Sequence, residues 1–100
     1  MTPFDLTGKV ICITGASSGI GRQCAISCSQ MGATVILMAR NEERLNETLS
    51  LMVNPEQHLI KIVDLTDYNQ VSVVVKDIVD QRGRIDGVVH CAGISTTLPL

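Results

Sequence analysis

A glycine-rich stretch at residues 14–21, Thr-Gly-Ala-Ser-Ser-Gly-Ile-Gly, constrains the fold of this chain more than any other feature. It follows a short β-branched apolar run at residues 10–13, which is typical of a buried strand. It precedes residues 22–31, which have the length of a helix. A turn from strand to helix directs free N–H groups and the positive end of the helix dipole at one spot. Phosphate is the natural ligand there, and glycine lets it approach the backbone closely or supplies a positive φ.

The spacing of three glycines in this stretch distinguishes between the known kinds of phosphate-binding loop. Gly15, Gly19 and Gly21 form the pattern G-x-x-x-G-x-G. The P-loop pattern does not fit, because residue 20 is isoleucine and no lysine follows it. The common dinucleotide fingerprint G-x-G-x-x-G does not fit either. A glycine-rich turn without any ligand is the weaker alternative, because a strand precedes the turn and a helix follows it.

Apolar runs predict four strands, at about residues 8–14, 33–39, 58–63 and 85–91. The second run is apolar without a break and does not alternate with polar residues, which suits a parallel sheet covered on both faces. The first helix should end at Gly32, a typical residue just beyond a helix C-terminus. Apolar or small residues occur along it at Ile20, Cys24, Cys28 and Met31.

Two further helices are predicted between the later strands. Asn41 can cap the first of them, which ends before Asn54-Pro55 and has one apolar stripe. That stripe consists of Leu45, Leu49 and Met52. Residues 71–81 are ambiguous, since local propensity favours a strand and apolar spacing favours a helix. We predict a helix because parallel strands need a crossover, and Asp67 with Gln70 resembles a capping box at its start.

These elements predict an α/β fold, a doubly wound parallel sheet of the Rossmann-like type formed as one domain by residues 1–100. Its first four strands should have the order 3-2-1-4, with right-handed crossover helices on both faces. The switch point then lies between strands 1 and 4. The glycine-rich loop and Ala92-Gly93 should both lie at carboxyl ends of strands beside that crevice.

Composition and charge exclude several classes of function. The net charge is −2, with no basic cluster for nucleic acid or a membrane surface. No apolar run approaches the roughly 20 residues of a membrane span, and the first residues do not form a secretory signal. The four cysteines and two histidines lack metal-ligand spacing. We interpret the cysteines as reduced apolar residues and expect a cytoplasmic protein.

Four signatures in order, covering most of residues 8–94, resemble the short-chain dehydrogenase/reductase family. They are residues 14–21, Ala39-Arg40, Asp64-Leu65 and residues 90–93. The resemblance is loosely to 3-oxoacyl-acyl-carrier-protein reductases. It implies an oxidoreductase that transfers hydride between a nicotinamide cofactor and a small carbonyl or alcohol substrate, and a complete protein that is a homo-oligomer.

The resemblance also implies which residues bind the cofactor. The glycine-rich loop would line the pyrophosphate and a ribose, and Asp64 and Leu65 would meet the adenine. The implied cofactor-binding residues are Gly15, Ser17, Ser18, Gly19, Ile20, Gly21, Arg40, Asp64, Leu65, Ala92 and Gly93. The family usually has Asn-Asn-Ala-Gly where this chain has residues 90–93, His-Cys-Ala-Gly. The hydrogen bonds of the second asparagine would be lost at Cys91, which affects local sheet stabilisation, and His90 is interpreted as structural.

The end of the second strand indicates which cofactor is preferred. An acidic residue there would bind the ribose hydroxyls of NAD and repel a 2′-phosphate. This chain has Ala39 there, and Arg40 follows, whose guanidinium can pair with phosphate. We therefore expect NADP(H), with NAD(H) as the weaker choice.

The catalytic residues of the family have no match in this chain. The family uses a serine and a Tyr-x-x-x-Lys pair, but Tyr68 is the only tyrosine here and Ser72 stands four residues after it. We expect no catalytic residue among residues 1–100 and interpret them as the cofactor-binding half of a longer reductase. A stand-alone, non-catalytic dinucleotide-binding module is the alternative, and a methyltransferase is a weaker third. A reading frame that continues past Leu100 with the serine and the Tyr-x-x-x-Lys pair would decide between the first two.

Overall fold

The structure is a computed structural model that describes residues 5–16 and 19–91. Strands and helices alternate along the chain, and a short 3-10 helix precedes the third strand. The elements are β1 (Val10–Thr14), α1 (Gly19–Gln30), β2 (Thr34–Ala39), α2 (Glu42–Ser50), η1 (Pro55–Gln57), β3 (Leu59–Ile62), α3 (Tyr68–Arg82) and β4 (Gly87–His90).

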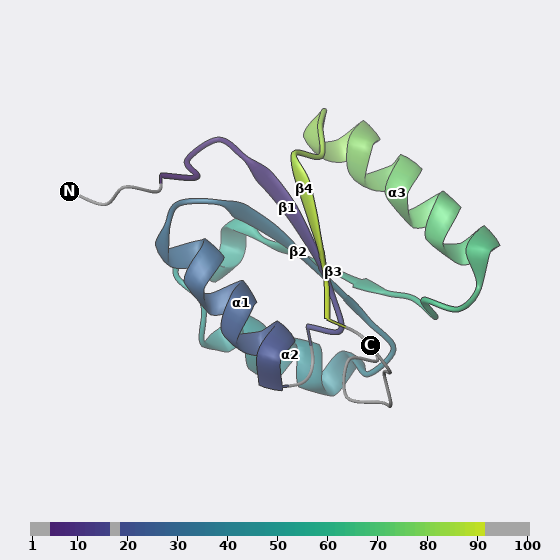
Figure 1. Ribbon diagram of the computed structural model, residues 1–100, viewed down its shortest axis with the longest axis horizontal. Coiled ribbons are helices and arrows are strands. Elements are labelled where there is room, and N and C mark those ends of the chain that lie inside the picture. Colours follow the sequence, from purple (N-terminus) through teal and green to yellow (C-terminus); the bar gives the residue numbers. More distant parts are fainter. Residues whose placement is uncertain (1–4, 17–18, 92–100) are drawn as a thin grey trace, which may run out of the picture.

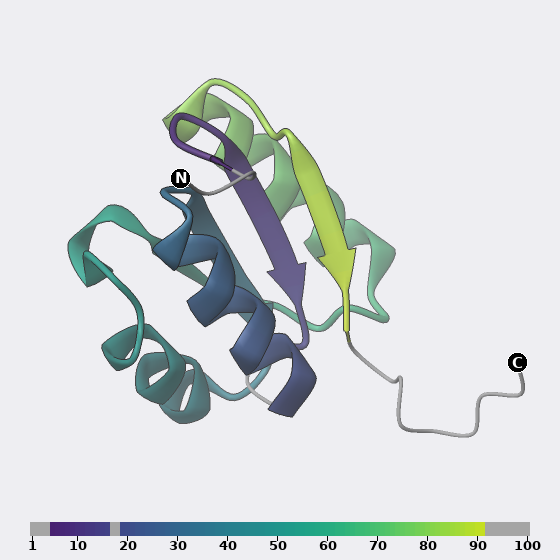
Figure 2. The same ribbon diagram turned by 60° about the vertical axis from the view of Figure 1, so that its left-hand side comes forward.

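The four strands form one parallel sheet in the order β3-β2-β1-β4, which confirms the predicted fold class and strand order. Figure 1 shows α1 and α2 on one side of this sheet and α3 on the other. β1 and β4 run side by side in the same direction (Figure 2), with Cys12 opposite Val88. Helices cover both faces because each crossover between parallel strands must leave the plane of the sheet.

β2 lies inside the sheet and is buried on both of its faces. Val35, Ile36 and Leu37 are all 0% exposed. The side chains of Val35 and Leu37 join the core under α1 and α2, and Ile36 joins the core under α3. This placement is why the second apolar run of the sequence is unbroken rather than alternating.

The face that α1 packs against the sheet differs from the apolar positions of its sequence. Its buried residues are Gly21, Ala25 and Ser29, which are spaced four apart. Ile20 is 61% exposed. Cys24 is only half-buried, as are Cys28 and Met31. Small side chains let the helix axis approach the sheet closely, and the larger Cys24, Ile26 and Cys28 pack against the same core as partly buried residues.

Several predicted boundaries are corrected by the structure. α1 begins at Gly19, three residues before the predicted start, so Gly19, Ile20 and Gly21 of the glycine-rich stretch are already helical. α2 ends at Ser50 rather than near Asn54, and η1 follows after Asn54 adopts a positive φ of 52°. β4 covers Gly87–His90 only and is shorter than the predicted strand at 85–91.

Helix α3 is confirmed over the segment where propensity and spacing disagreed. Asp67 caps it by accepting hydrogen bonds from the backbone N–H groups of Asn69 and Gln70, and Gly83 ends it in the left-handed region. The predicted capping box is only half present. The Oε1 atom of Gln70 accepts from the backbone N–H of Asp64 at 3.0 Å, not from that of Asp67.

Candidate functional site

The carboxyl ends of the four strands meet at one edge of the sheet, and the candidate residues lie there. β1 leads into the glycine-rich loop, β2 into Arg40, β3 into Asp64 and Leu65, and β4 into Cys91. The chain leaves β1 toward α1 on one face and reaches β4 from α3 on the other face. The gap between these two connections is where doubly wound proteins bind ligands.

The three glycines of the loop have three different physical roles. Gly15 has a φ of +73°, a conformation that L side chains rarely adopt, and its N–H donates to the Met38 carbonyl at 2.9 Å. A Cβ on Gly21 would lie 2.1 Å from the carbonyl oxygen of Gly15, so Gly21 allows the helix to pack on the loop. A Cβ on Gly19 would meet no atom within 4 Å. Gly19 therefore faces open space, where a ligand can approach the backbone.

The first turn of α1 completes an anion-binding geometry beside Gly19. The helix begins at Gly19 and has no acidic residue in its first turn. The N–H groups of that turn have no partner within the helix, and the helix dipole makes them attractive to an anion. These residues fit a pyrophosphate group. Ser17, Ser18, Ala92 and Gly93, also predicted to bind the cofactor, lie outside the described residues.

Asp64 is held as an ionised carboxylate beyond the end of β3. Its Oδ1 atom accepts from the hydroxyl of Thr66 at 2.7 Å and from the backbone N–H of Thr66 at 3.0 Å. These bonds, and to a smaller extent the charge of Arg40, lower the pKa of Asp64. The backbone N–H of Asp64 donates to the Oε1 atom of Gln70. Such a carboxylate can accept a hydrogen bond from an amino group of a ligand. Leu65 is half-buried beside it and packs against the core under α3.

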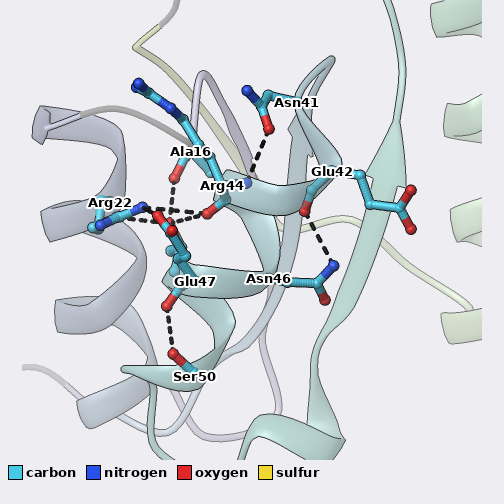
Figure 3. Close-up of polar contacts among 9 residues, drawn as sticks. Ala16, Arg22, Asn41, Glu42, Arg44, Asn46, Glu47 and Ser50 are labelled. Atoms are coloured by element: carbon cyan, nitrogen blue, oxygen red, sulfur yellow. Dashed lines mark hydrogen bonds and ion pairs between the residues drawn. The ribbon is translucent and has the colours of Figure 1, made fainter.

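Arg40 lies at the same edge, directly beyond β2, and is exposed. β2 and β3 are neighbouring parallel strands with Ala39 opposite Ile62, so Arg40 and Asp64 both follow their strands at this edge of the sheet. Asn41 caps α2, because its Oδ1 atom accepts from the backbone N–H of Arg44 at 3.0 Å (Figure 3). Ala39 is only 7% exposed and belongs to the core under α1. No carboxylate therefore occupies the end of β2, and a guanidinium follows it.

His90 and Cys91, which replace the asparagines usual in the family, have different environments. His90 is exposed, and its Nδ1 atom lies 3.4 Å from the hydroxyl of Thr14. Cys91 is 7% exposed, and burial raises the pKa of its thiol, with the nearby Cys24 adding to the effect. Its backbone N–H donates to the Thr14 carbonyl at 3.1 Å, so the end of β4 stays attached to β1 without an asparagine side chain.

The other histidine and the cysteines serve the core. His58 is 6% exposed, its Nδ1 accepts from the Val35 N–H at 2.9 Å, and its Nε2 donates to the Val53 carbonyl at 2.8 Å. All four cysteines are free. Across residues 5–16 and 19–91, no cluster of three or more ligating side chains could hold a metal ion. Over the same residues, no helix is long and apolar enough to cross a membrane.

Two features of the site region were not predicted from the sequence. The first is an apolar groove of about 730 Å³ between α3 and the β1–β4 part of the sheet. It is lined by Cys12, Thr14, Met38, Leu65, Thr66, Val71, Val75, Ile85, Val88 and His90. The second is a hydrogen-bonded connection from Thr48 to the loop. The signal for it was a threonine on the apolar face of α2, three residues after Leu45.

Comparisons with known proteins agree with this geometry. The family model for short chain dehydrogenases matches residues 9–100. A 3-ketodihydrosphingosine reductase from Bos taurus is 40% identical in an alignment 99 residues long that covers 93% of this chain and 30% of that protein. The chain belongs to the short-chain dehydrogenase/reductase family. Members of this family are oxidoreductases that bind nicotinamide dinucleotides and act on small molecules.

Solved structures of the family share the fold of this chain. The glucose dehydrogenase of Caenorhabditis elegans in its apo form matches with a TM-score of 0.82 and 31% identity, over 90% of this chain and 40% of that one. A short-chain dehydrogenase/reductase of unknown function from the same organism, solved with cofactor, matches with a TM-score of 0.77 and 33% identity, over 83% of this chain and 32% of that one. This chain thus spans about 30–40% of the length of these relatives.

Proposed function

We propose that these residues form the NADP(H)-binding part of an oxidoreductase that transfers hydride between nicotinamide and a carbonyl or alcohol substrate. The loop supports this most directly, because Gly19 is open on its Cβ side, Gly15 has a positive φ and the first turn of α1 is free of acidic residues. The bound nicotinamide would supply or accept the hydride. The residues of this chain would hold the pyrophosphate, the adenine and the ribose phosphate.

The preference for NADP(H) over NAD(H) rests on the end of β2. Ala39 offers no carboxylate to the ribose hydroxyls. Arg40 is exposed, and its charge contributes to the lowered pKa of Asp64. A guanidinium at this point can pair with the 2′-phosphate, while Asp64 accepts from the adenine amino group. Together, Arg40 and Asp64 would recognise the ribose 2′-phosphate and the adenine of NADP(H).

The test compares NADPH and NADH binding in the complete protein by fluorescence titration. NADPH should bind more tightly, and Arg40→Leu should weaken it by about ten- to a hundredfold, since a charge-assisted hydrogen bond contributes about 1.5–3 kcal/mol. NADH affinity should stay the same. Ala39→Asp combined with Arg40→Leu should reverse the preference, at some cost in stability because Ala39 is buried.

Arg82→Leu is the matched control, because it removes the same charge at the last residue of α3, far along the chain from the site. It should leave both affinities unchanged. Equal affinities of the unaltered protein for NADPH and NADH would refute the cofactor preference. Binding of neither cofactor would refute the proposed function as a whole.

We further propose that the reacting groups lie in sequence that follows Leu100, in a cytoplasmic protein that assembles as a homo-oligomer. The single tyrosine here, Tyr68, is 82% exposed at the start of α3, and no lysine follows it at the family spacing. The bovine relative is named for a ketone, so a ketone is the first substrate class to test with NADPH. If the reading frame ends at Leu100, the non-catalytic module becomes the better interpretation.

A further inference from the structure

Thr48, a fully buried threonine on α2, connects that helix to the glycine-rich loop. It is 0% exposed, and its hydroxyl donates to the carbonyl oxygen of Ala16 at 2.9 Å. Ala16 follows Gly15 in the loop and is itself 0% exposed. The bond joins residues 32 positions apart in the sequence. A second acceptor, the Arg44 carbonyl one helical turn earlier, lies farther away at 3.2 Å.

Arg22 on α1 also forms a hydrogen bond with the Thr48 hydroxyl. Its Nε atom donates to Oγ1 of Thr48 at 2.9 Å, and its Nη2 atom contacts the Arg44 carbonyl at 3.3 Å. Nη2 also forms an ion pair with Glu47 at 3.2 Å. Figure 3 shows Arg22 extending from α1 toward Arg44 and Glu47 of α2, with Ala16 beside them. α1, α2 and the loop therefore share one hydrogen-bonded network.

The donor and acceptor capacity of the hydroxyl explains the direction of these bonds. A threonine hydroxyl has a single proton to donate and lone pairs to accept with. The guanidinium of Arg22 can only donate, so it uses a lone pair of Oγ1 and leaves the proton for the closer carbonyl, that of Ala16. A charged donor on the oxygen also polarises the hydroxyl and strengthens its own bond.

We infer that Thr48 and Arg22 are positioning residues for the pyrophosphate site, an inference that rests on the proposed function. They hold the Ala16 carbonyl in place before a cofactor binds. The backbone of Gly15 and Ala16 packs against Gly21 in the first turn of α1, where a Cβ would lie 2.1 Å from the Gly15 carbonyl oxygen and 3.1 Å from the Ala16 Cα. Anchoring Ala16 therefore also holds that turn, whose N–H groups are available to an anion. Pre-organised N–H groups bind a phosphate without a further loss of loop entropy. The network thus acts on the part of the cofactor that NADPH and NADH share.

This role predicts a different effect from that of Arg40. Arg40→Leu should weaken NADPH alone, whereas Thr48→Val should weaken both cofactors by the same factor. Removing the hydroxyl leaves the Ala16 carbonyl and the Arg22 Nε–H without this partner, so the loop must be ordered when the cofactor binds. We expect about three- to tenfold weaker binding of NADPH and of NADH, the usual effect of one hydrogen bond. Thr48→Ser, which keeps the hydroxyl, should restore both affinities.

Ser29→Ala is the matched control, because Ser29 is also a buried hydroxyl between α1 and the segment after α2. It is 4% exposed, donates to the Ile26 carbonyl at 2.7 Å and accepts from the Val53 N–H at 3.1 Å. These bonds do not involve the loop. In the complete protein, Ser29→Ala should lower the denaturant midpoint as Thr48→Val does, with cofactor affinities unchanged.

Both affinities are measured by titration and the stability by denaturant unfolding, so loss of structure is separated from loss of positioning. Equal affinities for Thr48→Val and Ser29→Ala, or no rescue by Thr48→Ser, would overturn the inference and leave the proposed function intact. Failure of the unaltered protein to bind either cofactor would overturn both. If Thr48→Val does not fold, Arg22→Met decides instead, with an expected loss of about two- to fivefold for both cofactors; unchanged affinities there would overturn the inference.

Discussion

Gly19 and Gly21 are two residues apart, but a side chain would meet different surroundings at the two positions. At Gly19 a Cβ has no neighbour within 4 Å, so Gly19→Val should leave the sheet folded. The same side chain would occupy the space that the pyrophosphate needs, and cofactor binding should be abolished. Fluorescence titration with NADPH and a thermal unfolding curve of the complete protein would test both parts. Unchanged affinity would remove the loop from the proposed site.

Gly21→Ala is the contrasting variant, because it should affect stability rather than the space for the cofactor. Its Cβ would lie 2.1 Å from the Gly15 carbonyl oxygen, and backbone must move to accommodate it. Overpacking of this kind typically costs about 1–3 kcal/mol, so we expect a clear fall in the unfolding midpoint. A stable Gly21→Ala variant with normal binding would contradict the packing role assigned to this glycine.

At the scale of elements, the amino-terminal ends of β1 and β4 are joined by Asp86. Its Oδ2 atom accepts from the Val10 N–H at 2.8 Å, and its Oδ1 atom forms an ion pair with Arg84 at 2.6 Å. The Arg84 side chain, followed by the Val10 N–H, lowers the pKa of Asp86 below its usual value. A lowered pKa in the folded state means that this stabilisation is present above the unfolded pKa of about 4, and is lost as pH falls through the folded pKa.

Asp86→Asn should therefore lower the melting temperature of the complete protein at pH 7. The difference from the unaltered protein should shrink as the pH is lowered through the pKa of folded Asp86. Asp80→Asn, an exposed carboxylate on α3, is the control for the change in net charge and should have little effect at either pH. A melting difference at Asp86 that is independent of pH would show that the charge of this carboxylate does not stabilise the strand pair.

At the scale of the whole molecule, the α3 face leaves much apolar surface in contact with solvent. Val88 on β4 is 51% exposed and Val73 on α3 is 68% exposed, and the apolar groove lies between these elements. β4 is also an edge strand of the described sheet. Exposed apolar edges and patches favour association. We predict that residues 1–100 in isolation associate as their concentration rises.

Sedimentation of the isolated chain at several concentrations would measure this association. Val88→Lys, which places a charge on the edge strand, should shift the population toward monomer. We also predict no carbonyl reduction with NADPH by the isolated chain, since Tyr68 has no lysine partner at the family spacing. A stable monomer with a sharp thermal transition would instead favour the stand-alone module. Turnover of any ketone would contradict our assignment of the reacting groups to later sequence.

The sequence alone determined the kind and order of the elements, because those depend on short-range patterns. The unbroken apolar run of β2 and the crossover requirement for α3 led to the correct sheet order. Gly15, Gly19 and Gly21 located the loop because few residues other than glycine suit a turn between strand and helix. Arg40 and Asp64 could be placed at one edge of the sheet from the sequence, because each follows a predicted strand and neighbouring parallel strands end at the same edge.

Only the tertiary structure decided which surfaces meet, because that depends on distances between segments far apart in the chain. The close approach of α1 to the sheet buried Ala25 and Ser29 and left Ile20 exposed, against the order of hydrophobicity. The same packing places Gly21 against the Gly15 carbonyl, whereas Gly19 faces open space. The bond from Thr48 to Ala16 spans 32 residues. The threonine on the apolar face of α2 indicates a buried hydroxyl, but nothing in either segment identifies Ala16 as its partner.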